Sequence, residues 1–165
     1  MKLYIKQKVF SFNDKFTVKD ENGTDRYFVE GEVFTIGKKL HVYDENQVER
    51  IYFQQKVWSF LPRFFVYVDG QQVAEIVKEF SFLKPRYSVL GLDWEVDGNF
   101  WAHEYQILNQ GRVVVSIKKE WLTWGDTYVL DIVDSRDELN ALAVVLAIDA
   151  VMSQQRATAS NTTTR

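Results

Sequence analysis

Apolar and polar residues alternate in short runs from residue 2 to about residue 132. The first run, residues 3–12, reads LYIKQKVFSF, and similar runs follow along the chain. Turn signals such as Asp69-Gly70 and Asp97-Gly98 separate the runs. Alternation with a period of two places one face of a strand in the core, and these dipeptides tolerate the positive φ angles of tight hairpins. The pattern therefore predicts short antiparallel strands that form a sandwich or a barrel.

The period changes after residue 134, and residues 138–155 read ELNALAVVLAIDAVMSQQ. Asp134 or Ser135 can cap a helix here, and Ser135 followed by Glu138 fits a capping box. The Ala, Leu and Met residues that follow favour helix. The sequence predicts a helix over about residues 135–155 and a disordered polar tail over residues 157–165.

This helix is apolar on all sides, because Asp149 is the one polar residue between residues 141 and 152. It could cross a membrane, lie on a membrane surface, or be enclosed by the protein. The apolar stretch is roughly 21 Å long, which is short of a hydrocarbon core of about 30 Å. Leu142 and Val145 interrupt the polar sector of the helical wheel, so the broad polar face of a surface helix is missing. We therefore predict no transmembrane segment and an antiparallel barrel closed around the helix; packing against one sheet face is the alternative.

Several stretches resemble the LURP-one-related family, which has the tubby C-terminal-like fold. They are LYIKQKVFSFNDKFTVKDENG and YFVEGEVF near the N-terminus, the strands VAEIVKEF and VVSIKKEW at residues 73–80 and 114–121, and DELNALAVVLAIDAVM. The resemblance covers residues 3–155. It implies a mainly β fold with a closed antiparallel β-barrel of about 12 strands around a central hydrophobic C-terminal α-helix. The barrel would be one domain, residues 1–156.

Composition excludes several classes of function. Lys and Arg number 20 against 23 Asp and Glu, a net charge of −3, so the basic excess typical of nucleic-acid binders is missing and we expect no nucleic-acid partner. The chain has no cysteine, which excludes disulfides, thiolate metal sites and thiol nucleophiles. Residues 1–12 lack the apolar core of a signal peptide, so we expect a cytoplasmic location.

A search for catalytic residues finds no motif. His41 and His103 lie far apart, and His103-Glu104 lacks the second histidine of a zinc-binding helix. Nucleophile elbows and glycine-rich phosphate loops are missing from the sequence. An EF-hand loop that began at Asp20 would need glycine at position 25 and glutamate at position 31, where the chain has Asp25 and Gly31. We expect a protein without catalytic activity, cofactor or metal.

Lipid binding is a function that the resemblance implies, since the wider group includes phosphoinositide-binding tubby domains and phospholipid scramblases. Headgroups would require converging cations, and Lys84 and Arg86, on either side of Pro85, could share a face. The Lys38-Lys39 and Lys118-Lys119 pairs are further candidates, but Lys118 and Lys119 cannot both face one ligand in a regular strand, because neighbouring strand residues point to opposite faces.

Two functional interpretations are favoured over a third, an enzyme or small-ligand carrier that uses a cleft at the end of the barrel. The first is a non-catalytic cytoplasmic scaffold or binding module, with another protein as partner. The second is a peripheral membrane protein that binds anionic phospholipid or phosphoinositide headgroups. Asp149 is either a buried switch or a carboxylate that meets Arg, Lys, a hydroxyl or water, because an isolated carboxylate is costly in an apolar helix. The five tryptophans, Trp58, Trp94, Trp101, Trp121 and Trp124, could line a ligand groove, but we expect them mainly in core and rim packing.

Overall fold

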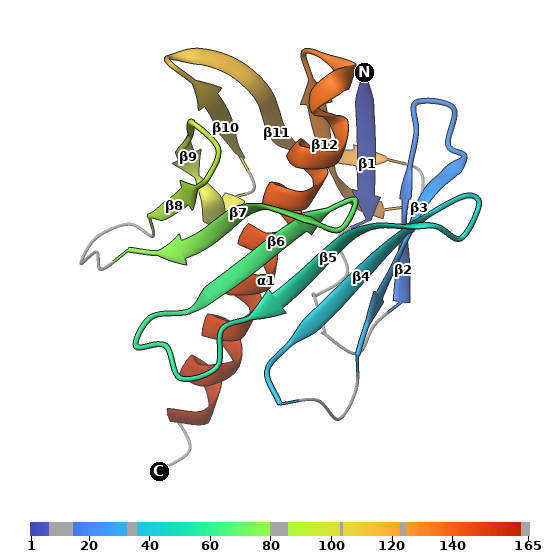
Figure 1. Cartoon of the computed structure of the whole chain (residues 1–165). Helices are drawn as coiled ribbons and strands as arrows, with labels where there is room; N and C mark the ends of the chain where they lie inside the picture. Colours follow the sequence, from blue (N-terminus) through green and yellow to red (C-terminus); the bar gives the residue numbers. More distant parts are fainter. Residues whose placement is uncertain (7–14, 33–35, 80–85, 103, 123–124, 163–165) are drawn as a thin grey trace.

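Twelve strands and one long α-helix make up the part of the chain that the computed structural model describes, residues 1–6, 15–32, 36–79, 86–102, 104–122 and 125–162 (Figure 1). Two short 3-10 helices cover Phe100–Ala102 and Ser135–Asp137. The main elements are β1 (Lys2–Lys6), β2 (Lys15–Lys19), β3 (Asp25–Gly31), β4 (Lys39–Asp44), β5 (Glu49–Gln55), β6 (Arg63–Val68), β7 (Gln71–Lys78), β8 (Tyr87–Leu90), β9 (Trp94–Asn99), β10 (Glu104–Asn109), β11 (Arg112–Leu122), β12 (Gly125–Ile132) and α1 (Glu138–Thr162).

The strands form a closed antiparallel barrel, as predicted. Each strand pairs with the one that follows it, and β1 also pairs with β12. The β1–β12 register places Leu3 opposite Leu130 and Ile5 opposite Tyr128, and all four side chains are buried in the core. Alternation along each strand thus sends one set of side chains inward, and closure leaves no open sheet edge for another chain to pair with.

Successive connections lie at opposite ends of the barrel, because neighbouring strands run in opposite directions. We call one end the loop end, which carries the β3–β4, β5–β6 and β7–β8 connections. The other is the turn end, which carries the β2–β3, β4–β5 and β6–β7 turns and the start of α1. In Figure 1 the β5–β6 connection points down and to the left, and the C-terminus also lies at the bottom.

α1 passes through the interior of the barrel and is enclosed by it. All residues from 141 to 152 are buried. They join one hydrophobic cluster with inward-facing strand residues, among them Phe53, Phe64 and Ile107. The expectation of an enclosed helix is therefore confirmed. Within the described residues, no helix combines the length and apolarity that crossing a bilayer requires.

The two ends of α1 differ from the sequence-based expectation. Asp134 provides the N-terminal cap by accepting from the backbone N–H of Arg136, but Ser135 begins a 3-10 turn and α1 itself begins at Glu138. At the other end the helix continues to Thr162, so residues 157–162, predicted as part of a disordered tail, are helical. Once a helix exists, each added residue gains a backbone hydrogen bond at little cost, which a prediction from polarity does not register.

Candidate binding surface at the loop end of the barrel

The described residues of the β3–β4 and β5–β6 connections meet at the loop end. The backbone N–H of Gln55 donates to the carbonyl of Lys38 at 2.8 Å, which joins the β3–β4 connection to the end of β5. The backbone N–H of Lys78 donates to the carbonyl of Pro62 at 3.1 Å, which joins the β5–β6 connection to β7. These bonds tie the described residues of the β3–β4 and β5–β6 connections to β5 and β7.

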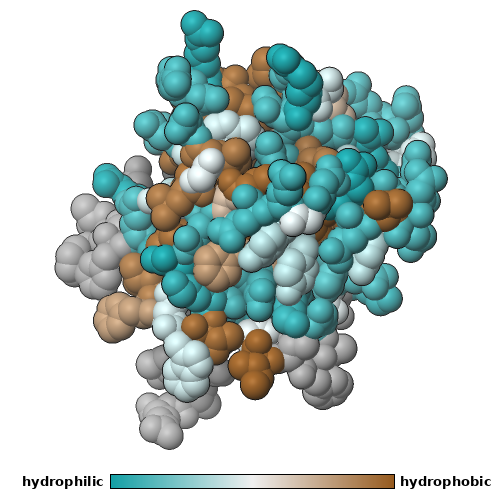
Figure 2. All heavy atoms as spheres, viewed as in Figure 1, coloured by the Kyte–Doolittle hydropathy of each residue, from teal (hydrophilic) through white to brown (hydrophobic). Residues whose placement is uncertain are grey.

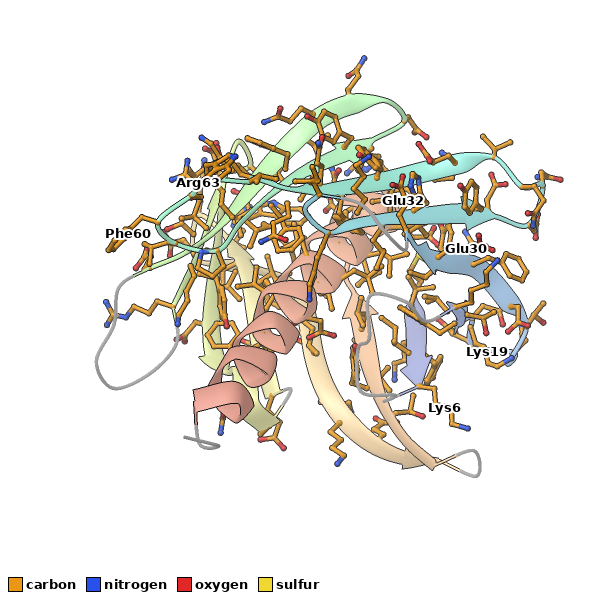
Figure 3. All side chains as sticks on the ribbon, turned by 90° about the horizontal axis from the view of Figure 1, so that it is seen from below. Lys6, Lys19, Glu30, Glu32, Phe60 and Arg63 are labelled. Carbon is orange, nitrogen blue, oxygen red and sulfur yellow. The ribbon has the colours of Figure 1, made fainter. Side chains whose placement is uncertain are left out.

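Exposed apolar side chains occupy this surface. The exposed fraction is 98% for Trp58, 99% for Phe60 and 86% for Ile36, and Val57 is partly exposed. We call these four residues the apolar tip. Figure 2 shows apolar residues at the lower end of the molecule, and in Figure 3 Phe60 lies at the rim and points away from the barrel. Apolar side chains gathered on an exposed surface mark a site of interaction with a partner.

Gly37 allows the two connections of the apolar tip to touch. Its φ is +79°, and a Cβ added there would lie 2.8 Å from Cγ2 of Val57 and 3.3 Å from the carbonyl oxygen of Gln55. A side chain at position 37 would therefore require Val57 to move. The absence of a Cβ therefore lets the β3–β4 connection pack directly against Val57 and brings Ile36 next to the β5–β6 connection.

Trp58 has an uncommon backbone conformation, with φ at +64°. The left-handed region is unfavourable for a bulky L-residue, because its Cβ crowds the following carbonyl. The turn nevertheless holds Trp58 there and directs a large aromatic ring into solvent. This conformation and the full exposure of the ring make Trp58 a candidate contact residue.

Cationic side chains lie beside the apolar tip. Lys56, which precedes Val57, is exposed, and its Nζ lies 5.7 Å from the centroid of the Phe65 ring. Lys38 follows Gly37 and is half-buried, and burial lowers the pKa of its amine. Both cations share the loop end with the apolar residues, so the surface combines positive charge with exposed apolar area.

Of the two predicted lipid-binding residues, Arg86 lies at this end and Lys84 lies outside the described residues. Arg86 is exposed, and its carbonyl accepts the backbone N–H of Glu79 at 2.9 Å, at the base of the β7–β8 connection. The further candidate Lys118 is an outward residue of β11, 3.0 Å from Glu120. The described part of the chain thus places Arg86 at the same end of the barrel as Lys38 and Lys56.

The turn end carries acidic residues in its tight turns. The carboxylate of Asp20 accepts the backbone N–H groups of Asn22 at 2.8 Å and Thr24 at 2.9 Å, and Asp44 makes the same arrangement in the β4–β5 turn. These backbone donors hold the pKa of both carboxyls below the usual range. The residues that build the tight turns are therefore acidic and ionised, and they stand at the far end of the barrel from the apolar tip.

A second polar cluster lies inside the barrel, around Asp149. The hydroxyl of Tyr128 donates to the Asp149 carboxylate. A hydroxyl was one of the partners that the sequence suggested for Asp149. Tyr105 is also buried, and burial together with the nearby Asp149 charge raises the pKa of both tyrosines well above the ordinary value. Asp149 and the two phenols are enclosed by the core, so this cluster joins α1 to the barrel wall rather than to solvent.

The histidines do not assemble a metal centre in the described part of the chain. The ring of His41 lies between two carboxylates, with Nε2 2.8 Å from Glu32 and Nδ1 2.5 Å from Glu49. His103 lies outside the described residues. Among the residues that the structure describes, no group of three or more His, Asp or Glu side chains has an arrangement that could hold a metal ion.

Trp58 and Phe60 are the residues that sequence reasoning missed, because tryptophans were expected in packing. Trp94 is buried, as expected, whereas Trp58 is almost fully exposed. The signal was available in residues 56–62, KVWSFLP, which lie between two strands and lack a turn dipeptide. A connection that is apolar where the other turns are acidic is a candidate contact surface.

Comparison with known proteins agrees with this architecture. The model of the LURP-one-related family matches residues 1–149. The uncharacterized protein YxjI of Bacillus subtilis (strain 168) is 36% identical over 152 residues, which cover 92% of this chain and 94% of YxjI. The X-ray structure of a protein from Arabidopsis thaliana has a TM-score of 0.59 and 14% identity over 90% of both chains. At that identity the likeness shows a shared fold alone.

Proposed function

The chain belongs to the LURP-one-related family, and from that premise we propose that it is a non-catalytic binding module whose partner is an anionic membrane surface. One observation carries the proposal: the loop end presents the apolar tip together with the cationic side chains of Lys38, Lys56 and Arg86. The place of action that we propose is the cytoplasmic face of a membrane, where anionic lipids give a negative surface potential.

The filled interior favours a partner that binds outside the barrel. α1 occupies the axis, and the side chains of the wall pack against it in one cluster. A lipid or substrate that entered the barrel would have to displace this helix. The buried polar cluster around Asp149 already has a role in joining the helix to β12, since Tyr128 donates to it. A function at the outer surface therefore requires the least change of the structure.

The charge distribution favours a membrane rather than an uncharged apolar partner. Although the net charge is −3, acidic residues such as Asp20 and Asp44 lie in turns at the turn end, and Glu32 at the loop end is paired with Lys39 at 3.3 Å. The cations at the loop end would meet a negative surface, while the acidic turns would lie farthest from it. An electrostatic term of this kind weakens with added salt, because mobile ions screen exposed charges.

Vesicle flotation tests the proposal. We expect the protein to float with vesicles of phosphatidylcholine and phosphatidylserine, to float less with phosphatidylcholine alone, and to be released in part by high salt. Addition of soluble inositol phosphates distinguishes headgroup recognition from recognition of the bilayer, since only the former would be competed. If the protein stays out of the vesicle fraction with every anionic lipid, the proposal is wrong. A scaffold that binds a protein at the same loop end would then be the remaining interpretation.

A further inference from the structure

The geometry of the loop end points to a mode of membrane contact, which rests on the proposed function. We infer that the β5–β6 connection inserts Trp58 and Phe60, with Ile36 of the β3–β4 connection beside them, into the boundary between headgroups and acyl chains. Binding would therefore be partly hydrophobic, and the apolar tip would be the membrane anchor of the protein.

The chemistry of the three side chains suits this boundary. Tryptophan carries a large apolar ring with one N–H donor, and for this reason it collects at the interface between water and hydrocarbon. Phenylalanine and isoleucine have no polar atom in their side chains and gain by leaving water. Trp58 and Phe60 are separated by Ser59, which is less exposed than either, so both apolar side chains project from one turn.

The two connections are held in place before any membrane is met. Gly37 packs against Val57, and the N–H of Lys38 donates to the side-chain oxygen of Gln55 at 3.1 Å. The turn holds Trp58 in the left-handed region with its ring already in solvent. Insertion would require little reordering of these segments, and a surface ordered in advance loses less entropy on binding.

The cations beside the tip match the layer of lipid phosphates above an inserted anchor. Lys38 and Lys56 each adjoin a residue of the anchor segments, and long cationic side chains can lie along apolar surface while the charge stays in the headgroup layer. Arg86 extends the positive surface onto the β7–β8 connection. The same orientation keeps Asp20 and Asp44, at the turn end, away from the negative membrane.

Exposed apolar residues at the turn end provide matched controls. Val48 in the β4–β5 turn and Val133 after β12 have exposed fractions of 53% and 71%. They lie at the end of the barrel opposite the apolar tip, so an orientation-specific anchor should leave them in water. Replacement of either by serine removes exposed apolar area of the same kind without touching the loop end.

The absence of cysteine makes direct placement of a probe straightforward. We would introduce Ser59→Cys, between Trp58 and Phe60, or Asn46→Cys in the β4–β5 turn, and attach an environment-sensitive fluorophore. Vesicles of phosphatidylcholine and phosphatidylserine would carry a nitroxide quencher on the acyl chains. We expect a blue shift and quenching at position 59 and neither change at position 46.

The anchor should also be visible in affinity. The double variant Trp58→Ser/Phe60→Ser should weaken partitioning onto the same vesicles by about tenfold or more, because two large side chains no longer leave water. The Val48→Ser/Val133→Ser variant should partition like the parent. Circular dichroism of both variants verifies that the barrel is intact, and all four side chains are exposed, so folding should be unaffected.

The outcomes separate the inference from the proposed function. Flotation with anionic vesicles, combined with no quenching at position 59 and an unchanged affinity of the double serine variant, would overturn insertion and leave electrostatic surface binding. Quenching at position 46 as strong as at position 59 would overturn the orientation. A lack of flotation with every anionic vesicle would remove the proposed function itself, and the anchor with it.

Discussion

The hydroxyl of Tyr128 on β12 donates a hydrogen bond to the carboxylate of Asp149 on α1, and both side chains are buried within the barrel. Tyr128 faces inward from the strand that closes the barrel against β1, since it pairs with Ile5. A polar contact in this position links the central helix to the seam of the barrel wall. Without a donor such as Tyr128, the buried Asp149 carboxylate would lose its hydration without any compensating hydrogen bond.

Tyr128→Phe should destabilise the protein by about 1–3 kcal/mol, the typical cost of removing a donor from a buried charged acceptor. Asp149→Leu, which removes the acceptor and adds apolar volume, should cost less when it is made in the Tyr128→Phe background than in the parent. Denaturant unfolding of the parent, both single variants and the double variant completes the cycle. Additive effects would show that the two groups do not interact.

Alkaline pH should destabilise the protein through its buried tyrosines. Burial, together with the Asp149 charge, raises the pKa of Tyr105 and Tyr128 well above the ordinary value of 10.0. Above pH 10 the unfolded chain releases these protons while the folded chain keeps them, so stability present below pH 10 is lost as the pH rises toward the folded pKa. The expected slope is about 1.4 kcal/mol per pH unit for each tyrosine. Denaturant melts between neutral and strongly alkaline pH measure it, and a Tyr105→Phe/Tyr128→Phe variant should show a shallower decline.

The start of α1 depends on a contact with β3. Nη2 of Arg26 donates to Oε2 of Glu138 at 2.8 Å, and the hydroxyl of Tyr27 donates to Oε1 at 2.8 Å. Burial and the Glu138 hydrogen bond raise the pKa of Tyr27 to about 12. Arg26→Ala should lower the free energy of unfolding by about 1–3 kcal/mol, because it leaves the buried Glu138 carboxylate without its cation.

Arg50→Ala is the matched control for Arg26→Ala. Arg50 pairs with Asp69 at 2.6 Å at the turn end, where solvent screens the interaction. Loss of this pair should cost no more than about 1 kcal/mol. If Arg26→Ala and Arg50→Ala lost equal stability, the Arg26–Glu138 pair would contribute no more than a surface ion pair.

The strands and the enclosed helix could be predicted because local pattern decides them. Alternation marks the inward face of each strand, and a helix that is apolar all round has to be covered on every side. Glu138 shows where local pattern fails. Three residues after Ser135 it fits a capping box, yet its carboxylate meets Arg26 and Tyr27 on β3. A partner more than a hundred positions earlier leaves no trace in the spacing near the helix.

The sequence predicted only some of the residues at the loop end. Arg86 was identified as a cation in a connection, and the structure places it at the loop end. Trp58 was expected in packing, because aromatic residues near strands usually are buried. Its exposure follows from a backbone turn with φ at +64°, and a non-glycine residue carries no sequence signal for that conformation. Which connections share one end depends on the topology of the whole barrel.

Val145→Asp should prevent folding at ordinary temperature. Val145 is fully buried on the central helix, and a carboxylate there would lie in the hydrophobic cluster. Thermal melts followed by circular dichroism would report the loss. The exposed turn residue Val48 gives the comparison, since Val48→Asp should shift the melting temperature little. A Val145→Asp variant as stable as the parent would contradict the enclosure of α1.

Trp58→Asn should separate stability from binding. Asparagine tolerates the left-handed conformation far better than tryptophan does, so relief of strain at φ +64° should stabilise the folded protein by about 0.5–1 kcal/mol. No packing is lost, because the ring of Trp58 is almost wholly exposed. The same substitution removes the largest member of the apolar tip and should reduce flotation with anionic vesicles. Denaturant unfolding and flotation on one protein sample measure both effects. A variant that is less stable than the parent would show that the ring contributes to folding.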